Sequence, residues 1–116
     1  MIARIWHGVV PGEKADRYGS YLADSEKGVS DYRKVAGNRG AYLLRRDEGD
    51  RTHFMLISLW DSRRSIEGYA GLDIERAQYF PFDRECLLDP EPGVAHYEVL
   101  VAPGPAEGGI DPAQRS

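Results

Sequence analysis

The sequence contains only one cysteine, which excludes both a disulfide within the chain and a thiolate metal cluster. Cys86 has no second cysteine in the chain with which to form a disulfide, and it cannot by itself build a thiolate metal cluster. Protein chains without disulfides are typical of a reducing compartment. We therefore expect a cytoplasmic protein in which Cys86 is a small buried apolar residue rather than a nucleophile.

Long apolar runs and blocks of positive charge are also missing. No apolar stretch approaches the roughly 20 residues that a membrane helix needs, and the first residues, MIARIWHGVV, lack the layout of a signal peptide. The formal charge is -4 and the arginines are scattered, so nothing attracts a phosphate backbone. We expect neither a membrane nor a nucleic acid as partner.

The composition that remains suits one globular domain. The chain has 116 residues, of which 41% are hydrophobic and 29% charged, enough to bury one core. The last stretch, APGPAEGGIDPAQRS, is rich in Pro, Gly and Ala and has no periodic apolar residues to bury. The sequence predicts a folded domain over residues 1–101 and a flexible tail over residues 102–116.

Four segments have the β-branched and aromatic composition of strands, namely residues 2–10, 40–46, 52–60 and 94–101. The second and third are separated by DEGD, which predicts a hairpin turn at residues 47–50. Residues 2–10 end at Pro11-Gly12, where a turn or a helix start is favoured.

Helical spacing appears in two places between these strands. From Glu13 onward, Ala15, Tyr18 and Leu22 recur at intervals of three or four, which predicts an amphipathic helix. After Trp60, Asp61 or Ser62 can cap a second helix, with Ile66, Tyr69 and Ala70 as its apolar stripe and Gly71 as its end.

Three shorter segments receive weaker predictions. Gly28 interrupts the first helix, and Val29, Tyr32 and Val35 suggest a second short helical turn. Residues 73–79 have the pattern of another helical turn. The sequence Phe80-Pro81-Phe82 is interpreted as a break after it.

The order strand, helix, strand, strand, helix, strand predicts an α+β protein with a ferredoxin-like βαββαβ fold. Such a fold has a four-stranded antiparallel sheet with both helices on one face. In THFMLISLW both faces are largely apolar, since Met55 and Ile57 alternate with Phe54 and Leu56. The helices cover only one face, so we expect a homodimer in which two sheets pack together through an isologous interface.

Several segments of this arrangement resemble the antibiotic biosynthesis monooxygenase-like family. They are the strand ending in SLWDS, the helix SIEGYAG, the segment LDIERAQYFPFD and the closing strand AHYEVLV. The resemblance covers about the first hundred residues. It implies a dimeric α+β barrel with a pocket in each subunit between sheet and helices. Some relatives are monooxygenases that oxidise aromatic polyketides or quinols without metal or flavin, and others degrade haem.

The haem-degrading relatives differ from this sequence at two positions. They combine an Asn on the first strand, a Trp at the end of the third strand and an iron-ligating His on the second helix. Trp60 matches the Trp, but the first strand offers His7 in place of the Asn, and no His lies between Asp61 and Asp83. His7, His53 and His96 also form no compact metal motif. We expect neither metal nor cofactor.

The candidate site combines aromatic side chains with one base. Trp60, Tyr18 and Tyr69 are expected to hold an aromatic ring, although each is equally suited to the core. His7 shares a strand face with Ala3, Ile5 and Val9 and is the candidate catalytic base, or else a buried, hydrogen-bonded His.

Two further residues are candidates for substrate binding. His96 lies on a strand next to the first, and the unknown register leaves open whether His7 or His96 faces the pocket. Arg39, before the second strand, has the type of side chain that contacts a substrate carbonyl or enolate, or it is a solvated turn residue.

Three functions fit these residues. The first is a cofactor-independent monooxygenase acting on a small hydrophobic aromatic or quinone-like substrate. The second is a non-catalytic dimeric protein that binds a small ligand or serves a stress response, and the third is a domain that only mediates assembly. A titratable base facing a ligand-sized cavity separates the first from the second.

Overall fold

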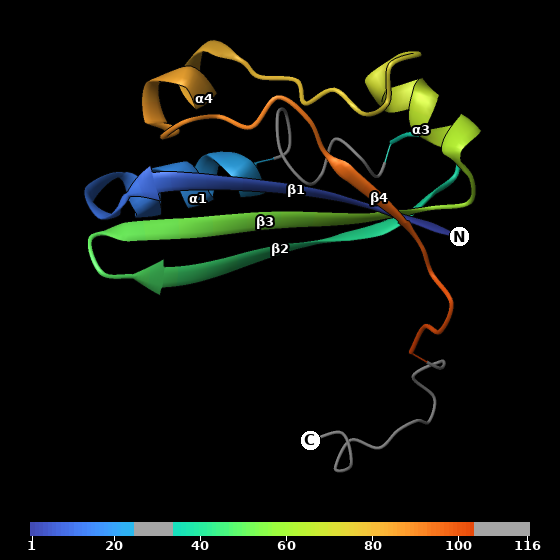
Figure 1. Cartoon of the computed structure of the whole chain (residues 1–116), viewed down its shortest axis with the longest axis horizontal. Coiled ribbons are helices and arrows are strands. Elements are labelled where there is room, and N and C mark those ends of the chain that lie inside the picture. The colour runs from blue at the N-terminus through green and yellow to red at the C-terminus, as the bar shows by residue number, and fades with distance from the viewer. Residues whose placement is uncertain (25–33, 104–116) are drawn as a thin grey trace.

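The computed structural model describes residues 1–24 and 34–103. In chain order the elements are β1 (Ile2–Pro11), the 3-10 helix η1 (Gly12–Lys14), α1 (Ala15–Ala23), β2 (Asn38–Glu48), β3 (Arg51–Trp60), α3 (Arg63–Ala70), α4 (Pro81–Cys86) and β4 (Ala95–Glu98) (Figure 1). The short helical turn expected around Val29 and Tyr32 lies outside the described residues, as does the expected tail from residue 104 onward.

The strands form one antiparallel sheet in the order β2-β3-β1-β4. Aromatic contacts place α1 and α3 on one face of the sheet. The ring centroid of Tyr18 in α1 lies 5.6 Å from that of Phe54, and the ring centroid of Tyr69 in α3 lies 6.2 Å from that of Trp60. Figure 1 shows α3 and α4 above the same side of the strands. The α+β ferredoxin-like arrangement predicted from the order of elements is confirmed.

Alternation along the strands separates two faces of the sheet. The inner face, beneath the helices, carries Phe54, Leu56 and Trp60 of β3 and Ile2 and Trp6 of β1, all buried. We call the opposite side the open face, with these side chains on its strands: Ile5, His7, Val9, Tyr42, Leu44, His53, Met55, Ile57, Leu59 and Tyr97. Tyr42, Leu44 and Tyr97 are 56%, 45% and 58% exposed.

The hairpin between β2 and β3 is longer than predicted. Glu48 pairs with Arg51, so the turn consists of Gly49 and Asp50 alone. Gly49 has φ of 62°, which glycine adopts without the steric cost that a side chain adds. Two residues predicted as turn, Asp47 and Glu48, therefore extend the ladder.

Capping signals placed α3 correctly. The Ser62 hydroxyl accepts a hydrogen bond from Ser65 N–H, and the Ser65 side chain accepts one from Ser62 N–H. At the other end, Gly71 has φ of 83° and donates its N–H to the Glu67 carbonyl. The helix spans Arg63–Ala70, as the Ser62 and Gly71 signals indicate.

The region between α3 and β4 corrects three predictions. Residues 73–79 contain no helix: a turn at residues 74 and 75, in which the Arg76 N–H donates to the Asp73 carbonyl, is followed by the bridge between Arg76 and Gly93. Phe80-Pro81-Phe82 is not a break but the start of α4, because Pro81 occupies the first turn, where its missing N–H is not needed. β4 is only four residues long, since it pairs with β1 over Ile2–Ile5.

The helices in residues 1–24 and 34–103 are short. None of them has the length and apolar composition required to cross a membrane.

Candidate functional site

A pocket lies between the inner face of the sheet and the segment from α3 to α4. Its lining combines β1, α1, β3, α3, α4 and the segments on either side of α4: Arg4, Trp6, Tyr18, Leu22, Leu56, Tyr69, Ala77, Gln78, Tyr79, Phe80, Asp83 and Val94. The empty space, counted with the solvent at its mouth, is about 510 Å³, but the space that the centre of a water molecule can reach is about 50 Å³. That is room for a few waters. Entry of an aromatic ring therefore requires lining side chains to move.

Tyr18 and Asp83 form the buried polar wall of the pocket. The Tyr18 hydroxyl donates to Asp83 Oδ1 at 2.7 Å, and Asp83 Oδ2 accepts the Phe80 backbone N–H at 2.7 Å. Burial, together with the carboxylate of Asp83, raises the pKa of Tyr18 well above its ordinary range, and the same two causes raise that of Tyr21 to about 12. Both phenols are protonated donors at neutral pH.

A second polar chain crosses the pocket wall from Trp6. Its indole N–H donates to the Tyr79 hydroxyl at 3.0 Å, and that hydroxyl donates to the Glu91 carbonyl at 2.6 Å. Burial raises the pKa of Tyr79 as well. The Trp6 ring lies along its own strand over Gly8, where a Cβ would come within 2.5 Å of the indole. Gly8 therefore allows the ring to line the pocket.

Arg4 is the cation of the pocket. It is 4% exposed, and its Nη2 lies 3.4 Å from the carbonyl oxygens of both Ile74 and Arg76. Its guanidinium lies 5.6 Å from the ring centroid of Tyr69. His96 is its cross-strand partner in β4 and so lies on the same face. Burial, followed by the charges of Arg4 and Arg63, lowers the pKa of His96 and favours a neutral ring.

Three of the six predicted site residues line or adjoin the pocket, and the other three lie elsewhere. Tyr18 and Tyr69 line the pocket, and His96 adjoins it through Arg4. Trp60 is fully buried beside Tyr69, with its N–H donated to Ser58 Oγ at 2.8 Å, and it seals the core without lining the pocket. The Arg39 side chain is 63% exposed and pairs with Asp61, so it is solvated, but it lies at the irregular start of β2 and not in a turn.

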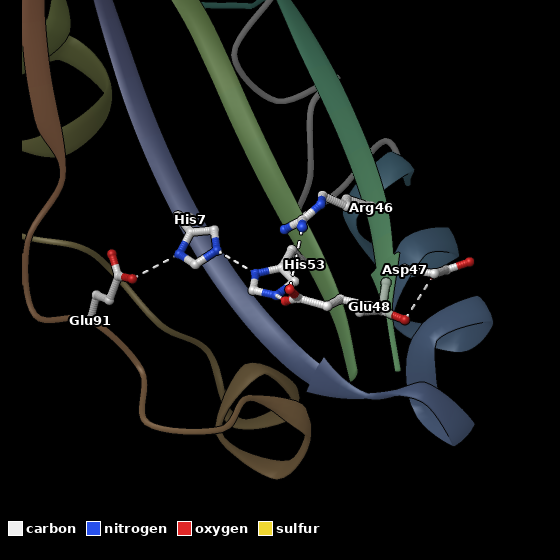
Figure 2. A network of polar contacts seen from close by, with 7 residues as sticks. His7, Arg46, Asp47, Glu48, His53 and Glu91 are labelled. Atoms are coloured by element: carbon white, nitrogen blue, oxygen red, sulfur yellow. Dashed lines mark hydrogen bonds and ion pairs between the residues drawn. The ribbon is translucent and has the colours of Figure 1, made fainter. Parts of the chain in front are cut away.

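His7 lies on the open face, across the sheet from the pocket. The register pairs it with Met55, and its ring joins that of His53 from the same side (Figure 2). A cavity bounded by Trp60, Tyr69 and His7 together is thus not formed. The reason is the two-residue period of β1, which directs Arg4 and Trp6 inward and His7 outward.

Around His7 there is a continuous chain of polar contacts. Glu91 Oε2 lies 2.8 Å from His7 Nδ1, His7 Nε2 lies 3.0 Å from His53 Nδ1, and His53 Nε2 lies 2.8 Å from Glu48 Oε1. Arg46 closes the chain by donating to the other oxygen of Glu48 at 3.3 Å. With both glutamates ionised, these contacts need three protons on four ring nitrogens.

Sequence reasoning missed Arg4, Trp6 and Asp83. The first two could have been found by applying to the other side of β1 the alternation that was used for His7: an arginine then falls between Ile2 and Trp6 on an apolar face. Asp83 was hidden because Pro81 was taken as a break. Within residues 1–24 and 34–103, no group of three or more His, Cys, Asp or Glu side chains is placed to hold a metal ion.

The sequence matches no family model. No curated protein matches it significantly. Among solved structures, it aligns with a proposed antibiotic biosynthesis monooxygenase from Bacillus cereus, with a TM-score of 0.61 and 11% sequence identity, over 92% of this chain and 98% of that one. At this identity the likeness establishes the fold. The chain therefore has the α+β fold of that protein, in agreement with the resemblance stated from its sequence.

Proposed function

We propose that the protein is a small cofactor-independent monooxygenase that takes a hydrophobic aromatic or quinone-like molecule into the pocket between sheet and helices. The observation that carries this proposal is the lining of the pocket, in which apolar walls from Trp6, Leu22 and Leu56 meet the phenols of Tyr18 and Tyr69. Small-molecule sites have this composition, because apolar surface supplies affinity and a few polar groups fix orientation. The shared fold with a proposed monooxygenase supports it.

The proposed chemistry needs a base and a group that holds an anion. A substrate that loses a proton becomes an anion able to pass an electron to O₂. The substrate radical and the superoxide formed in this step combine to give a peroxide. Loss of water from the peroxide leaves a carbonyl. One oxygen atom of O₂ enters the substrate and the other leaves as water.

We assign the base to His96 in place of His7. Asp83, the carboxylate in the lining, is already engaged by the Tyr18 hydroxyl and the Phe80 N–H. In contrast, both ring nitrogens of His96 are buried and have no hydrogen-bond partner among the described residues. The lowered pKa of His96 keeps the ring neutral and therefore able to accept a proton near pH 7.

Oxygen consumption by the purified protein with a panel of hydroquinones and anthrones tests the proposal. His96→Ala should lower turnover by about 10² or more, as loss of a general base does, whereas His7→Ala should leave it nearly unchanged. The reverse pattern would return the base to His7 and refute the assignment. Absence of oxygen uptake with every compound that binds would refute the oxygenase activity.

A non-catalytic ligand-binding or stress-response protein is the alternative. No histidine is among the described residues that line the pocket, since His96 only adjoins it through Arg4, and a pocket that no base faces favours binding over catalysis. Binding of the same compounds without oxygen uptake would support this alternative.

We also propose that the active form is a homodimer joined through the open face. Tyr42, Leu44 and Tyr97 are exposed there, above the partly buried Met55 and Ile57. Contiguous apolar surface of this kind is typical of an interaction site. A twofold axis through the face would bury the same residues on both copies.

A further inference from the structure

Arg4 is a buried cation with no carboxylate partner among the described residues. Its two contacts to the carbonyls of Ile74 and Arg76 are 3.4 Å long, beyond the usual range for an N–H···O bond, and its Nε has no partner. Its remaining contact is with the face of the Tyr69 ring. Burying a charge without compensation is costly, so the surroundings of Arg4 favour an anion.

Four other polar side chains of the pocket are occupied by each other or by backbone. They donate these hydrogen bonds: Tyr18 to Asp83, Trp6 to Tyr79, Tyr79 to the Glu91 carbonyl and Gln78 to the Ala70 carbonyl. Arg4 also lines the pocket, but its Nε–H donates no hydrogen bond to any described residue. The pocket therefore offers a ligand a guanidinium donor.

His96 adds a second polar group at the same place. It is paired with Arg4 across the two strands, and both of its ring nitrogens are buried without partners among residues 1–24 and 34–103. Burial lowers the pKa of His96, Arg4 and Arg63 lower it further, and Glu75 opposes them, so the charges near this ring are mostly positive. Three nitrogens without hydrogen-bond partners among the described residues thus belong to Arg4, in the pocket lining, and to its cross-strand neighbour His96.

We propose that Arg4 and His96 form a subsite for one ionised oxygen of an aromatic ligand, whose ring occupies the pocket. The oxygen belongs to a phenolate, an enolate or a carboxylate, all of which present an anionic acceptor on a planar carbon framework. A guanidinium suits such an acceptor because its donors lie in one plane. This inference rests on the proposed function, since it uses the same pocket.

The roles of Arg4 and His96 depend on whether the ligand arrives ionised or neutral. A ligand that arrives ionised accepts hydrogen bonds from Arg4 Nε–H and from the protonated nitrogen of neutral His96. A phenol or enol gives its proton to the free nitrogen of His96, and the resulting imidazolium and Arg4 then hold the anion. The subsite therefore makes the anion that the proposed oxygenation requires.

Calorimetric titration of the full-length protein with matched naphthalenes tests the subsite. The first pair is 1-naphthoate against the neutral 1-naphthamide, and the second is 2-naphthol against 2-methoxynaphthalene. We expect the ionisable member of at least one pair to bind about tenfold or more tightly than its neutral partner. A preference in the first pair identifies a carboxylate as the preferred anion, and a preference confined to the second identifies a phenolate.

Variants of two arginines test whether the preference for the ionisable compound depends on Arg4. Arg4→Met should abolish this preference, so that both members of the pair bind equally, and Arg51→Met, at an exposed strand end, should preserve it. Where Arg4→Met fails to fold, Arg4→Lys keeps the charge but lacks the planar fork, and it should reduce the preference. The His96 ring signals in NMR should move on addition of the preferred anion and not of its neutral partner.

The outcomes separate this inference from the proposed function. Equal binding of both members in each pair would overturn the subsite and leave the aromatic pocket in place. Binding of none of the four compounds would overturn both. A preference that survives in Arg4→Met would show that Arg4 serves only to hold the carbonyls of Ile74 and Arg76.

Discussion

His7 and His53 lie edge to edge on the open face of the sheet, with their ring centroids 5.2 Å apart and 3.0 Å between His7 Nε2 and His53 Nδ1. The antiparallel register, which pairs Val9 with His53, makes them diagonal neighbours although they are far apart in sequence. Glu91 and Glu48 close the two ends of the pair. Figure 2 shows the resulting chain running from Glu91 across both rings to Glu48.

Replacement of His53 by Phe should raise the pKa of the Glu48 carboxyl. The hydrogen bond from His53 and the charge of Arg46 hold that pKa below its ordinary value of 4.5. A depressed carboxyl pKa contributes stability above the unfolded-state pKa, and this contribution is lost as pH falls through the folded-state pKa. Wild type should therefore lose more stability than the variant between about pH 5 and pH 3. An NMR titration of Glu48 that is the same in both proteins would contradict this.

Tyr18→Phe should destabilise the protein by about 1–3 kcal/mol at neutral pH, because Asp83 loses a buried donor. The raised pKa of Tyr18 also has a consequence in alkali. Its stability contribution is fully present below the unfolded-state value near 10 and is lost as pH rises toward the folded-state value. Urea denaturation should therefore show a smaller alkaline loss in Tyr18→Phe than in wild type.

Gly8→Ala should destabilise the protein by about 1–3 kcal/mol through overpacking. A Cβ at this position would lie 2.5 Å from the Trp6 ring and 2.7 Å from Leu87 Cδ2. Gly12→Ala makes a matched control, because its added Cβ would have only a 3.2 Å contact with the Asp50 carbonyl oxygen. Thermal unfolding measures both, and a Gly8→Ala protein as stable as Gly12→Ala would show that Trp6 moves freely.

More of the fold than of the candidate site could be predicted from the sequence. Period-two alternation in β1 and β3 and the Ser62 and Gly71 signals of α3 are local, so they are readable from sequence. The orientation of His7 depended on which face the helices cover, and that is a property of the assembled sheet. The partner of Tyr18, Asp83, lies 65 residues away on a helix that begins with Pro81. No local pattern indicates that pairing.

Leu44→Glu should convert the proposed dimer to a monomer. Leu44 is 45% exposed on the open face opposite Met55, and a carboxylate there would be buried against its symmetry copy without compensation. Light scattering after size exclusion should give twice the 13.0 kDa of the chain for wild type and the single mass for the variant. Leu72→Glu, at an 87% exposed leucine outside the sheet, should remain dimeric. A wild-type protein of single mass would remove the open face as a self-association surface, while dimers in all three would place the interface elsewhere.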